Sequence, residues 1–173
     1  MKRGKVHKYL GIILDYSTVG QVNITMLDYI DEIIDAFDKS GPTGCSTKSS
    51  AATAILFKVK EYCKNINVKR AVEFHHLVVK ILFSTKWARP DTCTEISFLT
   101  TRAREPDNDD WSKLVNLIKY TRGTRNPPLI LSDNVSIMLK WWIDVSLSVH
   151  PNMRWQTGGG LSIGRGFPIV SST

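Results

Sequence analysis

The chain has 173 residues, of which 42% are hydrophobic, so it is long enough to bury the core of one domain or of two small ones. Its formal net charge of +7 favours an anionic partner, nucleic acid before an anionic membrane surface, although a merely basic protein would look the same. The apolar runs are short and interrupted by charge, which excludes a membrane-spanning segment. Its three cysteines form no CxxC pair, so we expect no zinc site and an intracellular, reducing compartment, cytoplasmic or nuclear.

The N-terminal part of the chain predicts a β-hairpin followed by a helix. Residues 9–14 and 21–25 are separated by turn residues, which is typical of two paired strands. Residues 28–37 carry apolar side chains at the spacing of one helical face, namely Ile30, Ile33, Ile34 and Phe37. The polar stretch at about residues 40–54 has no such period and predicts a flexible loop.

Three further helices are predicted in the middle of the chain. The first is marked by apolar residues on one helical face, namely Phe74, Leu77, Val78, Ile81 and Leu82. Arg89-Pro90-Asp91 ends it and begins a second helix, which closes near Arg104. The acidic residues 106–110 precede a third helix, which carries Trp111 and stops at Gly123.

The predicted secondary structure changes from helices to strands after Pro127-Pro128. Strands are predicted at residues 129–131, 137–148, 159–163 and 168–170. We therefore expect an α+β fold with a domain boundary near Asn126. Residues 1–126 would hold the β-hairpin and a helical module, and residues 127–173 an incomplete antiparallel sheet.

Asp144 is the most informative single residue because it lies in an apolar strand, residues 141–146 (WWIDVS). A carboxylate there is costly to bury unless it is paired or bound to a metal. Strand alternation places Trp142, Asp144 and Ser146 on one face. Two interpretations stay open: a carboxylate that is presented to Mg²⁺, and an ordinary exposed aspartate on an edge strand.

Other clusters of polar residues favour structural roles. The acidic residues of the first helix, which predict a solvated face, are Asp28, Asp31, Glu32, Asp35 and Asp38. A calcium loop that began at Asp38 would need glycine in place of Thr43 and glutamate in place of Ser49. Neighbouring His75 and His76 would point about 100° apart on a helix, so we expect a partly buried His76 beside an exposed His75 rather than a metal pair.

Basic residues flank the second and third of the central helices. They are Arg102, Arg104, Lys113, Lys119, Arg122 and Arg125. Lys119 and Arg122 lie three residues apart and therefore share a helical face. This face could follow a sugar-phosphate backbone without reading bases, or it could simply be solvated and balanced by nearby aspartates.

Several segments together resemble the reverse transcriptase of copia-type LTR retrotransposons, from its C-terminal part into the first strands of the attached ribonuclease H domain. In chain order they are residues 9–12 (YLGI), 74–78 (FHHLV), 88–91 (ARPD), 98–102 (FLTTR), 120–124 (YTRGT), 142–146 (WIDVS) and 157–159 (TGG). Each motif is short, and the specificity lies in their order and spacing. The resemblance covers nearly the whole chain except the loop.

The resemblance implies a primer-grip hairpin, a thumb-like helical module and the start of a ribonuclease H-like sheet. The nucleic-acid contacts expected from the resemblance and the charge pattern together are Lys8, Tyr9, Gly11, Arg89, Lys119 and Arg122. Asp144 matches the first Mg²⁺ ligand of the ribonuclease H centre. The paired aspartates of the polymerase are expected upstream of Met1 and the later carboxylates beyond Thr173, so we expect no stably bound Mg²⁺ and no catalysis by this chain alone.

We therefore interpret the chain as a fragment of a retrotransposon polyprotein, whose parent performs RNA-directed DNA synthesis and cleaves the RNA of hybrids. The expected partners are an RNA–DNA hybrid or primer–template and the remainder of the polyprotein, with no membrane. Two other interpretations stay open. The chain could be an inert remnant, or it could be a small basic module that binds an acidic protein.

Overall fold

The structure is a computed structural model that describes residues 4–39, 46–47, 56–132, 138–147, 155–162, 164 and 169–172. Over these residues the fold is α+β, with antiparallel strands first, helices in the middle and strands at the end, as predicted. The predicted loop at residues 40–54 lies outside the described residues except for 46–47. None of the described helices is both long enough and apolar enough to cross a membrane.

The N-terminal sheet contains β1 (Val6–Tyr9), β2 (Ile12–Asp15), β3 (Gln21–Thr25) and β4 (Leu129–Ser132), in that order and all antiparallel. Leu10 and Gly11 form the turn between β1 and β2, with φ angles of 50° and 79°. Two successive positive φ angles reverse a chain within two residues. The single strand predicted at residues 9–14 is therefore wrong, because the turn divides it between two strands.

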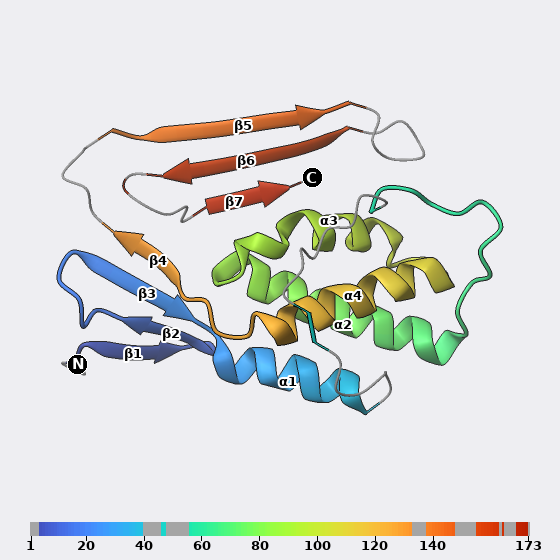
Figure 1. Ribbon diagram of the computed structural model, residues 1–173, viewed down its shortest axis with the longest axis horizontal. Coiled ribbons are helices and arrows are strands. Elements are labelled where there is room, and N and C mark those ends of the chain that lie inside the picture. Colours follow the sequence, from blue (N-terminus) through green and yellow to red (C-terminus); the bar gives the residue numbers. More distant parts are fainter. Residues whose placement is uncertain are drawn as a thin grey trace.

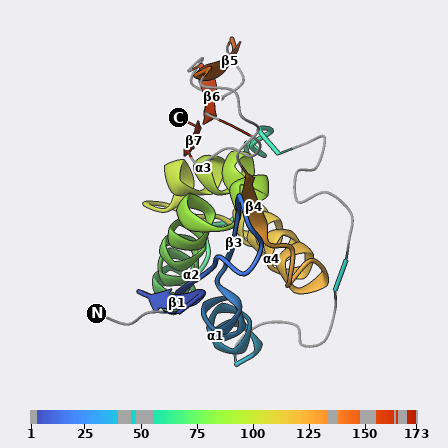
Figure 2. The ribbon, with the colours of Figure 1, turned by 90° about the vertical axis from the view of Figure 1, so that its left-hand side faces the viewer.

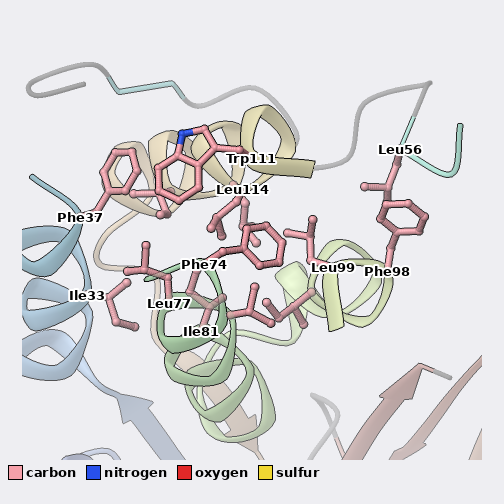
Figure 3. Close-up of a cluster of buried hydrophobic side chains, with 14 residues drawn as sticks. Ile33, Phe37, Leu56, Phe74, Leu77, Ile81, Phe98, Leu99, Trp111 and Leu114 are labelled. Carbon is pink, nitrogen blue, oxygen red and sulfur yellow. The ribbon is translucent and has the colours of Figure 1, made fainter. Parts of the chain in front are cut away.

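Four helices and a 3-10 turn follow, and they form the main core. They are α1 (Leu27–Asp38), α2 (Val68–Trp87), η1 (Pro90–Thr92), α3 (Cys93–Arg102) and α4 (Asn108–Gly123). Figure 3 shows side chains from α1, α2, α3 and α4 meeting in one cluster, with Leu56 added from the preceding segment. Each large apolar side chain buried there stabilises the fold by about 1.5–3 kcal/mol.

Side-chain caps define where two of these helices begin. The Asn67 side chain accepts a hydrogen bond from the amide of Arg70 at 2.9 Å and caps α2. At α4, Asp107 accepts from the amides of Asp109 and Asp110, while the Asp110 carboxylate accepts from the amide of Asp107. This reciprocal arrangement satisfies amide groups that a helix leaves without partners. The predicted acidic start of the third central helix is confirmed.

The second sheet contains β5 (Lys140–Ser146), β6 (Gln156–Ser162) and β7 (Ile169–Ser172), in that order and antiparallel. It lies on the opposite side of the helices from α1, with β7 beside α3, as the two views in Figures 1 and 2 agree. β5 is at the edge and is exposed along its whole length.

One strand pairs differently from the prediction. Residues 129–131 were expected to open the C-terminal sheet, but β4 pairs with β3, with Val22 opposite Leu131. The first strand after the double proline therefore completes the N-terminal sheet (Figure 1). The division into domains at residue 126 stays a prediction.

Candidate nucleic-acid interface

The first hairpin, formed by β1 and β2, carries three of the predicted contact residues, with Lys8 and Tyr9 in β1 and Gly11 in the turn. Tyr9 is 68% exposed, and the neighbouring Leu10 holds a positive φ of 50°, which is uncommon for a residue with a side chain. Gly11 follows at φ 79°, where a Cβ atom would make only ordinary contact with Tyr29, so the backbone angle rather than space favours glycine. The tip therefore presents an exposed aromatic ring on a turn whose shape is fixed by two left-handed residues.

Lys8 connects this hairpin to the first helix. Its Nζ lies 2.5 Å from a carboxylate oxygen of Asp28, in the first turn of α1, and both side chains are exposed. The hydrogen bond from Lys8 holds the pKa of Asp28 below its ordinary value. Exposed pairs of this kind contribute little to stability, so Lys8 can exchange Asp28 for an incoming phosphate at small cost.

Arg89 is buried, with only 2% of it exposed, and its guanidinium is occupied by neighbours within the fold. Nε and Nη2 donate to the two carboxylate oxygens of Asp91, while Nη1 and Nη2 donate to the carbonyl and hydroxyl of Thr124 at 2.9 and 2.7 Å. The group also stacks over the ring of Tyr120, at 5.6 Å. This geometry ties the start of η1 to the end of α4 and favours a structural role over the predicted phosphate contact.

Asp91 is the centre of the same network. Burial alone would raise the pKa of Asp91, but the hydrogen bonds from Arg89 and from the Tyr120 hydroxyl hold it below its ordinary value. Beside this network lies an open cleft of about 820 Å³, bordered by Asp91 and Tyr120 and by the segment from Gly123 to Leu129. The connection from the end of α4 to the start of β4 therefore lines much of this cleft.

Lys119 and Arg122 differ in their surroundings. Arg122 has a side chain that is 15% exposed and forms an ion pair with Asp38 at the end of α1. Arg125 pairs with Asp31, about two turns earlier on the same face of α1. The acidic face of α1 therefore neutralises the basic end of α4 instead of being solvated alone. Lys119 is half-buried, and its carbonyl accepts a hydrogen bond from the amide of Thr47 at 3.1 Å.

The remaining basic residues of the predicted face have mixed roles. Arg102 pairs with Asp107 and Asp110, and Lys113 pairs with Asp109 at 3.0 Å. The pairs of Arg102 join α3 to the capped start of α4, and the pair of Lys113 lies within α4. Arg104 is exposed, in the turn that follows α3.

The two histidines correct another prediction, because His75 and His76 are both exposed. His76 lies two residues after the buried Phe74, about 200° around the helix, and therefore on the opposite side from the core. The expected partial burial of His76 is wrong. Among the described residues, no three His, Cys, Asp or Glu side chains are placed to hold a metal ion together.

Asp144 lies in the middle of β5 opposite Gly158 and is exposed. The premise that this carboxylate would be costly to bury therefore does not apply. A Mg²⁺ site needs several oxygen ligands, and the described residues place no such group around Asp144. The described residues around Asp144 therefore do not fit a Mg²⁺ centre. The assignment of Asp144 as a metal ligand stays a prediction.

Sequence reasoning overlooked one cluster of cations. Residues 58–70 contain five, namely Lys58, Lys60, Lys64, Lys69 and Arg70, against one acid, Glu61. The structure wraps this segment around the beginning of α4, where Lys60 pairs with Asp109 at 2.9 Å. The sequence signal that could have revealed this cluster is the local excess of positive charge. That excess has no helical or strand period.

Comparison with known proteins gives one informative similarity. The chain is 24% identical, over 175 aligned residues, to a protein of Saccharomyces cerevisiae (strain ATCC 204508 / S288c) that is described as a transposon Ty5-1 protein, YCL074W. The alignment covers 98% of this chain and 54% of the yeast protein, so the chain spans about half the length of that relative. No family model matches the chain, and no solved structure matches it.

Proposed function

We propose that the chain derives from a retrotransposon and corresponds to the C-terminal region of a copia-type reverse transcriptase that runs into a ribonuclease H domain. The similarity to a transposon protein along nearly the whole chain supports the retrotransposon origin. The order of the segments 9–12, 88–91 and 142–146 supports the finer assignment. The chain holds an RNA–DNA hybrid or primer–template by its phosphates and performs no catalysis by itself.

The exposed tip of the first hairpin is the observation that carries the binding role. Tyr9 offers an aromatic ring to a nucleotide, and Lys8 lies beside it in an exposed pair that a phosphate can replace. Leu10 adopts a strained backbone, and strain of this kind concentrates at ligand-binding positions. The net charge of +7 supplies the general attraction to a polyanion.

Two of the residues named from the sequence have a supporting role in this proposal. Arg89 and Arg122 are held in ion pairs with Asp91 and Asp38. They position the end of α4, from which Lys119 extends toward the nucleic acid. Direct contacts are therefore assigned to Lys8, Tyr9 and Lys119, with Gly11 fixing the shape of the turn.

A salt titration of hybrid binding tests the proposal. The fluorescence anisotropy of a labelled RNA–DNA hybrid is measured with the full chain at increasing salt, and log affinity should fall by about 0.9 per log unit of salt for each phosphate neutralised. Tyr9→Ala should weaken binding, and Lys119→Gln should lower the salt slope by about 0.9. Val19→Ala is the matched control, because Val19 is 98% exposed at the next turn of the same sheet. Binding that is absent or insensitive to salt would refute the proposal.

The exposure of β5 favours a second candidate, an inert remnant without binding activity. Trp141, Trp142 and Ile143 are all more than half exposed on this edge strand. Hydrogen exchange separates the two cases. Protected amides in α2 and α4, unprotected amides in β5 and no hybrid binding would together favour the remnant.

A further inference from the structure

The cations of residues 58–70 are held in place by the main chain, although this segment has no helix or strand of its own before Val68. The carbonyl of Lys58 accepts a hydrogen bond from Lys113 Nζ at 2.6 Å, and the carbonyl of Lys64 accepts from the amide of Asn108 at 3.1 Å. Asn65 and Asp107 form an isolated β-bridge. The segment therefore presents its side chains from a fixed path around the beginning of α4.

The three aspartates beneath this path, at the start of α4, are already paired with cations, whereas Glu61 within the segment is exposed. Burial would raise the pKa of Asp109, but hydrogen bonds from Lys60 and Lys113 keep it lowered. Arg102 pairs with both Asp107 and Asp110. These three aspartates are buried, so they leave little negative charge at the surface.

The surface above them keeps an excess of positive charge. Lys58, Lys64, Lys69 and Arg70 are exposed, and the ion pairs of the described residues include none of the four. Arg70 is held over the ring of Trp111, at 4.8 Å, near the start of α4. We call these four residues the basic collar.

Tyr62 projects from the middle of this charged segment. Its side chain is 97% exposed, which is unusual for an aromatic residue in a segment held by main-chain hydrogen bonds. It lies at the turn that is closed by the bond from the Cys63 amide to the Lys60 carbonyl, at 3.4 Å. The ring is flanked in sequence by Lys60 and Lys64, so a base stacked on it would bring its phosphates toward the collar.

We propose that Tyr62 and the basic collar form a second nucleic-acid site, which takes an unpaired stretch of RNA or DNA. A single strand fits because its bases offer free faces for stacking, whereas duplex bases already stack on one another. The collar supplies the phosphate contacts and Tyr62 the stacking surface. The site rests on the proposed function only in that the chain meets nucleic acid, and it uses none of the residues assigned to the hybrid.

The test measures how two labelled probes bind the full chain. One is a single-stranded oligonucleotide of about 12 nucleotides, a length within the range that one binding module covers. The other is an RNA–DNA hybrid. Tyr62→Ala should weaken single-strand binding about tenfold, and Tyr62→Phe should preserve it. The double variant Lys58→Gln with Lys64→Gln should lower the single-strand salt slope by about 1.4, or 0.7 for each phosphate contact. Lys86→Gln, an exposed lysine at the far end of α2, is the matched control.

The outcomes distinguish this site from the proposed function. Loss of single-strand binding in Tyr62→Ala, with hybrid binding intact, supports the site even if Tyr9→Ala leaves hybrid binding unchanged. Equal affinity of the parent chain and Tyr62→Ala for the single strand would overturn it. Binding of polyglutamate as tight as that of the oligonucleotide, and equally dependent on the collar lysines, would also overturn it in favour of an acidic protein partner.

Discussion

The side chains of Arg89 and Asp91 form a two-pronged ion pair across a proline, with Nη2 and Oδ2 2.8 Å apart, while Arg89 also reaches Thr124 at the end of α4. Arg89 therefore links its neighbour Asp91 to Thr124, a residue far along the chain. The same guanidinium stacks on Tyr120, whose hydroxyl returns a hydrogen bond to Asp91. Each member of this network depends on the others for its partners.

Arg89→Ala should destabilise the fold by about 3 kcal/mol, because it leaves a partly buried carboxylate and a carbonyl without their donors. Arg89→Lys should recover only part of this, since a lysine cannot reproduce the forked geometry. Urea unfolding curves measure both. Arg104→Ala, at an exposed arginine, should change the free energy of unfolding by no more than about 0.5 kcal/mol. An unchanged unfolding midpoint for Arg89→Ala would contradict the structural role.

Glu95 predicts how stability depends on pH. This residue is buried, its Oε2 has no hydrogen-bond partner among the described residues, and burial raises its pKa above the ordinary value of 4.5, with a smaller contribution from Asp91. Folding therefore favours the neutral form of Glu95 more than the unfolded chain does. The stability that this preference supplies is complete below the unfolded pKa and is lost as pH rises through the folded pKa.

Glu95→Gln should consequently stabilise the protein at neutral pH, by about 1 kcal/mol, because it removes a buried charge that lacks a full set of partners. The advantage over the parent chain should shrink as pH falls toward 4.5. Thermal unfolding at a series of pH values checks this. A variant that is less stable than the parent at neutral pH would show that the carboxylate has a stabilising partner.

Gly123 allows close approach between α4 and the described residues 46–47. A Cβ atom at this position would lie 2.0 Å from the carbonyl oxygen of Thr47, which is main chain and cannot rotate away. Gly123→Ala would gain about 1 kcal/mol in helix propensity but should lose more through this overlap, for a net destabilisation of about 1–2 kcal/mol. The amide of Thr47, which donates to the Lys119 carbonyl, should exchange faster with solvent. Thr94→Ala on α3, an exposed site, is the control for propensity alone.

Asp144→Asn should change neither the stability of the protein nor its expected lack of cleavage activity. Because Asp144 is exposed on β5, the substitution should alter the free energy of unfolding by no more than about 0.5 kcal/mol. We expect no cleavage of the RNA strand of a hybrid by the parent chain with Mg²⁺ or Mn²⁺. Cleavage by the parent chain that disappears in Asp144→Asn would instead establish a working metal centre.

The helices were predictable from the sequence because their apolar spacing and caps are local signals. Ile30, Ile33, Ile34 and Phe37 face the core as expected, and the acidic residues before Trp111 form the predicted cap. The prediction that His76 is partly buried was wrong, although the same periodicity, applied from Phe74, puts this residue on the outer side of α2.

The errors in the sheets have non-local or unusual causes. The positive φ of Leu10 has no signature in the sequence, since leucine is a poor residue for such a turn. The pairing of β3 with β4 joins distant parts of the chain, and strand patterns do not say which strand will be the neighbour. At the candidate site, the sequence indicated cations but not which would be paired, so Arg122 and Arg89 seemed accessible.

The pairing of β3 with β4 also constrains how the protein can be made. On a ribosome, β3 emerges early, and its partner follows only after all the described helices have been synthesised. Until then one side of the nascent hairpin has unsatisfied amide and carbonyl groups that another strand could capture. Slow translation would therefore prolong this exposure. A bound chaperone would protect the hairpin more than it would help the helices, which can assemble from contacts close in sequence.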